Sequence, residues 1–239
     1  MISVIAQQPV IPEFERGSEC VRQNGQFCSD WFFDNFNRVF GPRLVEHIEL
    51  TAIAVGIGFT IAFTAALVAY SRGWFETPFA IFSAFLYTIP SLAFFQLMVP
   101  ITGLSVTSAE IALVSYTLLI LFRNTLTGLR EVPEEARVAA RAMGLTQQQI
   151  LRRVELPLAL PAIMAGIRIA TVTTISLATV AAFIGVGGLG EPIFNAIQSG
   201  FKTQFVAAGL LAVLLALVAD ALLVLLQRAL TPWARARRA

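Results

Sequence analysis

The sequence predicts an all-α protein that crosses a membrane five times. Of its 239 residues, 56% are apolar and only 13% are charged, whereas soluble domains carry about 25% charged residues. The apolar residues gather in blocks of about 20, the length at which a helix spans the apolar core of a bilayer. A helix also satisfies its own backbone hydrogen bonds in lipid, where water is absent. The composition therefore leaves no soluble domain of useful size.

Five segments are expected to form the spans. Three are clear: 50–70 and 78–101 carry no charge, and 205–226 carries only Asp220. Two are less uniform, because one has polar ends and the other contains Arg168 and several hydroxyl side chains. The expected spans lie near 48–71, 78–100, 108–129, 160–185 and 204–227. They make up a transmembrane domain at 44–233, between a tail at 1–43 and a basic tail at 234–239.

The positive charges predict the orientation of these spans. Lysine and arginine favour the cytoplasmic side of short loops. If the N-terminus lies outside, most of the 17 basic residues lie inside, and the outer loops near 101–107 and 186–203 carry only Lys202. We therefore expect the N-terminus outside the cell, the C-terminus in the cytoplasm, and the polar loop at 130–159 on the cytoplasmic side.

The N-terminal tail is expected to be translocated with the first span, since residues 1–10 lack the features of a secretory signal. Both cysteines lie in this tail, and the turn signal Asn24-Gly25 stands between them. Because disulfides persist outside the cytoplasm, we predict a Cys20–Cys28 bridge, the alternative being two free thiols. The aromatic stretch at 30–36 suits a short helix at the outer interface, with solute contact as the alternative.

The loop between the third and fourth spans carries clear helix signals. Pro133 with Glu134 and Glu135 is typical of a helix start. Gly144 is typical of a C-terminal cap. One face of this first helix is small and shallow; it consists of Ala136, Ala139, Ala140 and Met143.

A second short helix is expected at 147–154, with Thr146 as its cap. Pro157 and Pro161 are expected to stop this helix before the fourth span begins. Two short helices with a shallow face and an arginine rim suit insertion into a cleft of a partner protein. The alternative is a loop held on the lipid headgroups by its arginines.

The spacing in this loop resembles a known signature. Ala139-Ala140, three residues, Gly144, nine residues and Val154-Glu155-Leu156-Pro157 resembles the loop of permease subunits of binding-protein-dependent ABC importers. That signature reads E-A-A, three residues, G, nine residues, I-x-L-P. Val138 departs from it by standing at the acidic position. The resemblance implies an ATPase-coupling loop, whose residues here are Glu135, Val138, Ala139, Ala140, Gly144, Glu155, Leu156 and Pro157.

Two longer stretches, 154–168 and 183–190, look like the osmoprotectant branch of that family, whose solutes are glycine betaine, carnitine and choline. Amino-acid permeases, such as those for methionine, share much of the pattern and stay open as an alternative. The resemblance implies a type I importer fold in a bacterial or archaeal cytoplasmic membrane. It also implies cytoplasmic ATPase subunits that hold ATP and Mg, an extracytoplasmic solute-binding protein, a second permease copy or a homologous permease, and no nucleic acid.

Polar and kinked positions in the spans are candidates for a translocation path. Pro90 should kink the second span, and Thr171, Thr174 and Thr179 bring hydroxyls to the fourth. The alternative is that these hydroxyls bond to carbonyls of their own helix or hold helices together.

Asp220 is open to two interpretations: a structural ion pair with an arginine, or the ion-coupling acid of a secondary carrier. Arg168 is expected to snorkel. His47, beside Glu46 and Glu49, suggests a wet interfacial cluster rather than a zinc site. The glycines at 185–190 predict a tight turn into a short outer helix. No nucleophile–base arrangement is present, so neither catalysis nor a cofactor or metal is expected in this chain.

Overall fold

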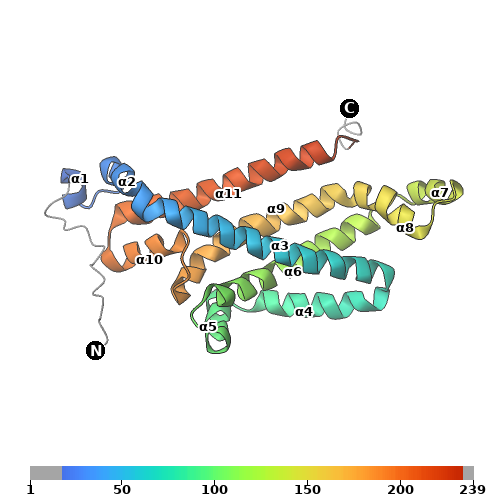
Figure 1. The fold of residues 1–239 in the computed structure, drawn as a ribbon, viewed down its shortest axis with the longest axis horizontal. Coiled ribbons are helices and arrows are strands. Elements are labelled where there is room, and N and C mark those ends of the chain that lie inside the picture. Colours follow the sequence, from blue (N-terminus) through green and yellow to red (C-terminus); the bar gives the residue numbers. More distant parts are fainter. Residues whose placement is uncertain (1–17, 234–239) are drawn as a thin grey trace.

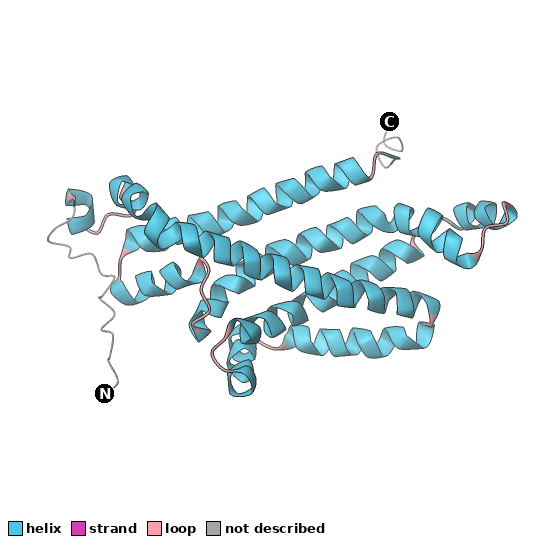
Figure 2. Ribbon diagram, in the orientation of Figure 1, coloured by secondary structure: helices cyan, strands magenta, loops and turns pink. Residues whose placement is uncertain are grey.

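The computed structural model describes residues 18–233; the predicted basic tail at 234–239 and the first part of the predicted outer tail lie outside the described residues. Within this range the chain is mostly helical and contains no β-strand (Figure 2). The elements are α1 (Glu19–Arg22), α2 (Ser29–Asn35), the π-helix η1 (Phe36–Phe40), α3 (Gly41–Ser71), the 3₁₀-helix η2 (Gly73–Phe75), α4 (Glu76–Thr88), α5 (Ser91–Thr102), α6 (Val106–Arg130), α7 (Glu134–Ala142), α8 (Gln147–Ile150), the π-helix η3 (Leu151–Glu155), α9 (Leu156–Ala181), the 3₁₀-helix η4 (Ala182–Ile184), α10 (Gly190–Ser199) and α11 (Lys202–Leu230).

The long helices α3, α6, α9 and α11 run along the same general direction (Figure 1). Helices α1, α2 and α10 gather at one end of this bundle and α7 and α8 at the other; we call these the α10 end and the α7 end. Four helical stretches of the described chain are long and apolar enough to cross a membrane: 29–71, 106–130, 147–184 and 202–230. The pair α4 and α5 could form a fifth crossing if the two are taken together.

The second expected span differs from the prediction of one kinked helix at 78–100. Helices α4 and α5 are separate and bend by 99° at the break between them. Ile89 is extended, with φ −66° and ψ 126°, as expected for a residue that precedes a proline. The hydroxyl of Tyr116 on α6 donates a hydrogen bond to the carbonyl of Ile89. This hydrogen bond gives a partner to a carbonyl that the end of α4 leaves without one. The break at Pro90 is therefore stabilised by α6, and the span is fully interrupted rather than kinked.

The predicted stop at Pro157 is wrong. Helix α8 continues through the π-helical turn η3 into α9, so that 147–184 forms one helical stretch. The ring of a proline clashes with the carbonyl four residues earlier in a regular α-helix. For Pro157 that residue is Arg153, which lies inside the wider η3 turn, and such a turn moves the carbonyl away from the ring. Pro161 also lies inside α9.

Small residues allow α3, α6 and α9 to pack closely. Gly128 of α6 faces α9, where an added Cβ would lie 2.7 Å from the Cβ of Ala162 and 3.1 Å from the carbonyl oxygen of Ala159. The side of α3 that faces the bundle is lined with buried alanines. Close approach through small residues is the usual way that helices associate in membranes. Helix α11 differs, since its most apolar window has no buried residue.

The segment 19–28, which contains α1 and which we call the disulfide lobe, lies at the α10 end (Figure 1). Cys20 and Cys28 are joined by a disulfide, with their Cα atoms 5.7 Å apart. The side chain of Asn24 donates to the Gly200 carbonyl at 2.9 Å and accepts from the Lys202 amide at 3.0 Å. The amide of Cys28 donates to the Thr203 hydroxyl at 3.0 Å. The lobe is therefore fastened to the first turn of α11.

The glycine-rich turn at 185–190 leads into the short helix α10, as predicted. His47, however, is fully buried rather than wet. Its Nδ1 accepts from the Leu189 amide at 3.1 Å, and its Nε2 lies 3.0 Å from the Ile175 carbonyl. Since Nδ1 is an acceptor, Nε2 carries the hydrogen and donates it to that carbonyl. The histidine thus fastens α3 to α9 and to the turn.

Candidate functional site

The loop at the α7 end has the local structure that its sequence predicts. Helix α7 begins after Pro133. It ends at Ala142 and is followed by Gly144, whose φ is +78°. The Gly144 amide bonds to the Arg141 carbonyl and the Leu145 amide to the Ala140 carbonyl, at 2.9 and 3.2 Å, which is the pattern of a glycine-terminated helix. Thr146 and Gln149 form a reciprocal capping box at the start of α8.

The face of α7 that points away from the bundle is only partly the one expected. Glu135, Val138, Ala139 and Met143 are exposed, whereas Ala140 is buried. Val138, the position where the signature has an acid, therefore presents an apolar side chain to the surroundings. Leu156 and Pro157 are partly buried at the start of α9.

Glu155 is the polar centre of this end. Its side chain is 1% exposed. Its Oε1 accepts from Arg137 Nε at 2.9 Å and from the Tyr70 hydroxyl at 2.7 Å. Arg137 also donates to the Leu129 carbonyl at 2.8 Å. One buried cluster thus joins the ends of α3 and α6 to α7 and to the turn before α9.

The charge of Arg137 is favoured by this cluster. Burial lowers the pKa of its guanidinium, but hydrogen bonds to Glu134 and Glu155 outweigh that effect and raise it above its ordinary value. The second oxygen of Glu155, Oε2, is buried and has no hydrogen-bond partner among the described residues.

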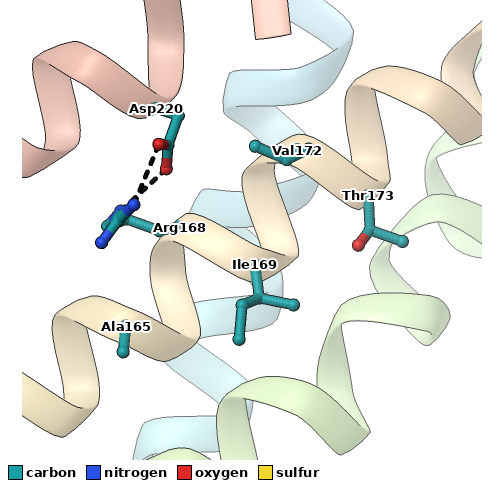
Figure 3. Close-up of a pocket in the computed structure, with 6 residues that line it drawn as sticks. All are labelled: Ala165, Arg168, Ile169, Val172, Thr173 and Asp220. Atoms are coloured by element: carbon teal, nitrogen blue, oxygen red, sulfur yellow. Dashed lines mark hydrogen bonds and ion pairs between the residues drawn. The ribbon is translucent and has the colours of Figure 1, made fainter. Parts of the chain in front are cut away.

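A second charged pair lies between α9 and α11 and is about one-third exposed. Arg168 of α9 donates from Nε to Asp220 Oδ1 at 2.7 Å and from Nη2 to Asp220 Oδ2 at 2.9 Å. Arg168 therefore does not snorkel; it pairs with an acid 52 residues further along the chain. Both side chains line a cavity of about 440 Å³ that is open on one side. Asp220 is its lining residue from α11, and the others come from α9: Ala165, Arg168, Ile169, Val172 and Thr173 (Figure 3).

The expected path residues lie on two parts of the fold, one at the α4–α5 break and three on α9. Thr174 is buried within the bundle, and Pro90 lies at the α4–α5 break. Thr171 donates to the carbonyl of Ile167 at 2.8 Å, and Thr179 to the carbonyl of Ser176 at 2.7 Å. Their hydroxyls thus make the bonds within their own helix that were the alternative interpretation.

Sequence reasoning missed Glu110 of α6. Both of its carboxylate oxygens are shielded from solvent and have no hydrogen-bond partner within 18–233. The signal was present, since an acid inside a span is costly, but its place near the polar end of the third span concealed it. No group of three or more potential metal ligands occurs among the described residues.

Comparison with known proteins places this fold among membrane transport proteins. Residues 54–235 match the family described as binding-protein-dependent transport system inner membrane component. The chain is 41% identical over 192 residues to the osmoprotectant import permease protein OsmW of Salmonella typhimurium, which covers 78% of this chain and 89% of the relative. It is 37% identical over 191 residues to the choline transport system permease protein OpuBB of Bacillus subtilis, covering 80% and 88%.

Solved structures show the same fold at lower identity. An inward-facing form of the MetNI methionine ABC transporter superimposes with a TM-score of 0.73 at 24% identity, over 85% of this chain and 100% of that one. An amino acid ABC transporter gives a TM-score of 0.71 at 18% identity, over 84% and 99%.

Proposed function

This chain belongs to the family of binding-protein-dependent transport system inner membrane components, and we propose that it is the permease subunit of an ATP-driven importer for a compatible solute with a quaternary ammonium group. Relatives at 35–41% identity are named for osmoprotectants, choline, or glycine betaine, carnitine and choline together. The solutes proposed for this chain are therefore glycine betaine, carnitine and choline.

The observation that carries the proposal is the buried cluster around Glu155. An ATPase subunit that moves α7 can move the spans only if α7 is attached to them, and Arg137 provides that attachment through Glu155 and Tyr70. The exposed side of α7, with Val138, Ala139 and Met143, is the proposed contact with the ATPase. ATP and Mg belong to that partner, and closure of the partner drives the alternation between outward and inward access.

The proposed topology has five crossings, with α4 and α5 as one of them, the α10 end outside and the α7 end in the cytoplasm. This orientation puts the Cys20–Cys28 disulfide in an oxidising compartment. It also puts Arg137, Arg141, Arg152 and Arg153 on the cytoplasmic side. The membrane is the cytoplasmic membrane of a bacterium or archaeon.

A second permease copy or a close relative completes the pathway, and a solute-binding protein delivers the solute from outside. Helix α11 exposes large apolar side chains along most of its length, so lipid or another permease has to cover it. The pairing of Asp220 with Arg168 does not favour a secondary carrier, because proton coupling would need a carboxylate that is free to titrate.

Gly144→Val tests the coupling role of the loop. The φ of +78° at this glycine costs about 1–2 kcal/mol for a residue with a Cβ. We expect the variant to insert into the membrane normally but to lose assembly with the ATPase, or solute-stimulated ATP hydrolysis, in proteoliposomes.

Gly200→Val is the matched control. Gly200 has a left-handed φ of +70°, and like Gly144 it has no atom within 4 Å of an added Cβ. It ends α10 with the same type of bond, from the Phe201 amide to the Ala196 carbonyl at 3.2 Å, but at the opposite end of the bundle. Solute-stimulated ATP hydrolysis that survives in Gly144→Val as well as in Gly200→Val would contradict the coupling role.

A further inference from the structure

The Arg168–Asp220 pair lies deep within the helices that carry it. Arg168 lies about 12 Å inside the expected span 160–185, and Asp220 about 11 Å inside the expected span 204–227, at about 1.5 Å per residue. A charge at such a depth is costly. The two residues neutralise each other through two hydrogen bonds.

The pair is not sealed by its surroundings. The Arg168 side chain remains 33% exposed and that of Asp220 35%. Charged side chains in membrane helices face the protein interior or a water-filled cavity rather than lipid. The open side of the cavity therefore faces a path or a neighbouring subunit, and in a permease such a space belongs to the route of the solute.

The cavity has the size and the chemistry of a small-molecule site. Its volume of about 440 Å³ falls in the usual range of about 300–1,000 Å³. Asp220 accepts hydrogen bonds from Nε and Nη2 of Arg168. The Nη1 atom of Arg168 makes no hydrogen bond within the described chain, so both of its N–H groups can donate to a ligand. Ile169 and Val172 form an apolar wall beside the charges (Figure 3).

We infer that this cavity is a transit site for a zwitterionic solute that carries a carboxylate and a quaternary ammonium. The carboxylate binds the free edge of the Arg168 guanidinium, while the ammonium lies near Asp220. A quaternary ammonium has no N–H to donate, so the charge of Asp220 and contact between its methyl groups and the apolar wall hold it. The inference rests on the proposed function and adds the place in the permease where the solute is recognised.

The test uses the complete transporter, with its ATPase and binding protein, reconstituted in proteoliposomes and supplied with radiolabelled glycine betaine. Wild-type uptake tests the proposed function by itself: if no quaternary ammonium solute is imported, that function fails whatever the variants do. If glycine betaine is imported, the double variant Arg168→Met/Asp220→Leu tests the site. It removes both charges and leaves apolar side chains, a change that often keeps a protein folded.

The expected result is a loss of glycine betaine uptake of at least tenfold, with assembly and melting temperature unchanged. The control is Arg43→Met/Glu191→Leu, which removes another ion pair at 2.7 Å between side chains of similar exposure, 36% and 37%. It also removes the 2.9 Å bond from Arg43 to Glu46, and it should change uptake less than twofold. Uptake by Arg168→Met/Asp220→Leu within twofold of the wild type would overturn the site.

Two further variants cover the remaining outcomes. If the double variant does not assemble, Ile169→Trp decides, because its larger side chain narrows the cavity and keeps both charges. Normal assembly with a tenfold loss of uptake supports the site, and normal uptake overturns it. In Arg168→Met, which keeps Asp220, uptake of the cation choline should fall much less than uptake of glycine betaine. An equal loss of both solutes would mean that the pair only holds the two helices together.

Discussion

Replacing Arg137 with methionine should weaken the attachment of α7 to the spans. The substitution leaves the buried carboxylate of Glu155 with Tyr70 as its only neighbour from the present cluster. Because Glu155 is 1% exposed and its Oε2 already has no partner in the described chain, an uncompensated charge would remain in the interior. Breaking a buried pair in this way lowers the free energy of unfolding by about 3–5 kcal/mol. Because the Tyr70 hydrogen bond remains, we expect the lower value, about 3 kcal/mol.

The loss can be measured as the melting temperature of the purified permease–ATPase complex. For a chain of this size, about 3 kcal/mol corresponds to a decrease of about 6–12 °C. Solute-stimulated ATP hydrolysis should fall as well, since the motion of α7 would no longer reach α3 and α6 through Glu155.

Arg141→Met is the matched control, because Arg141 lies on the same helix and bonds to the same acid, Glu134, at 3.3 Å. Both partners of that pair are more than half exposed, at 55% and 59%, so it contributes about 0–1 kcal/mol. Adding Glu155→Leu to Arg137→Met should recover most of the lost stability by removing the stranded charge. Equal melting temperatures for Arg137→Met and Arg141→Met would refute the reasoning.

Two other substitutions test the packing and the disulfide lobe. Gly190→Ala would bring a Cβ to 2.0 Å from the backbone oxygen of Thr179, so it should lower the free energy of unfolding by about 3 kcal/mol or more. In contrast, the Cβ of Gly209→Ala in α11 meets nothing within 4 Å, and this variant should match or slightly exceed the wild type in melting temperature. Equal melting temperatures for the two variants would contradict the packing around Gly190. Replacing Cys20 and Cys28 with serine removes a cross-link that stabilises the fold by about 2.5 kcal/mol for a loop of this length. Limited proteolysis near the start of α11 should therefore become faster. An unchanged cleavage rate would show that the lobe does not fasten that turn.

Local signals in the loop were sufficient to predict its helix caps. Gly144 and Thr146 act on their own neighbours, through the backbone conformation of a glycine and the reach of a short hydroxyl side chain, so their sequence context contains most of the information. The same holds for the four stretches of the described chain that are long and apolar enough to cross a membrane.

The errors concern residues whose outcome depends on distant partners. A proline in a span is compatible with a kink or with a break, and Tyr116, far from Pro90 in sequence, provides the hydrogen bond that stabilises the break. Pro157 was expected to stop a helix, but the π-helical turn before it accommodates the ring. To predict the pairing of Arg168 with Asp220, one must know which side of α9 faces which side of α11. An almost uniformly apolar span has no polar face that would reveal this orientation.

Helix α11 behaves mechanically as a rod with two supports. The first is at Lys202 and Thr203, where the disulfide lobe holds it, and the second is at Asp220, about 27 Å further along. A straight rod fixed at two separated points can rotate about its own axis but cannot tilt. Tilting has to release the hydrogen bonds at one support, either those to the lobe or those to Arg168. In the stretch from Asp220 to Leu230, about 15 Å long, the Gln227 side chain adds a longer contact to the Pro161 carbonyl at 3.5 Å, and this contact has to open as well when the second support does.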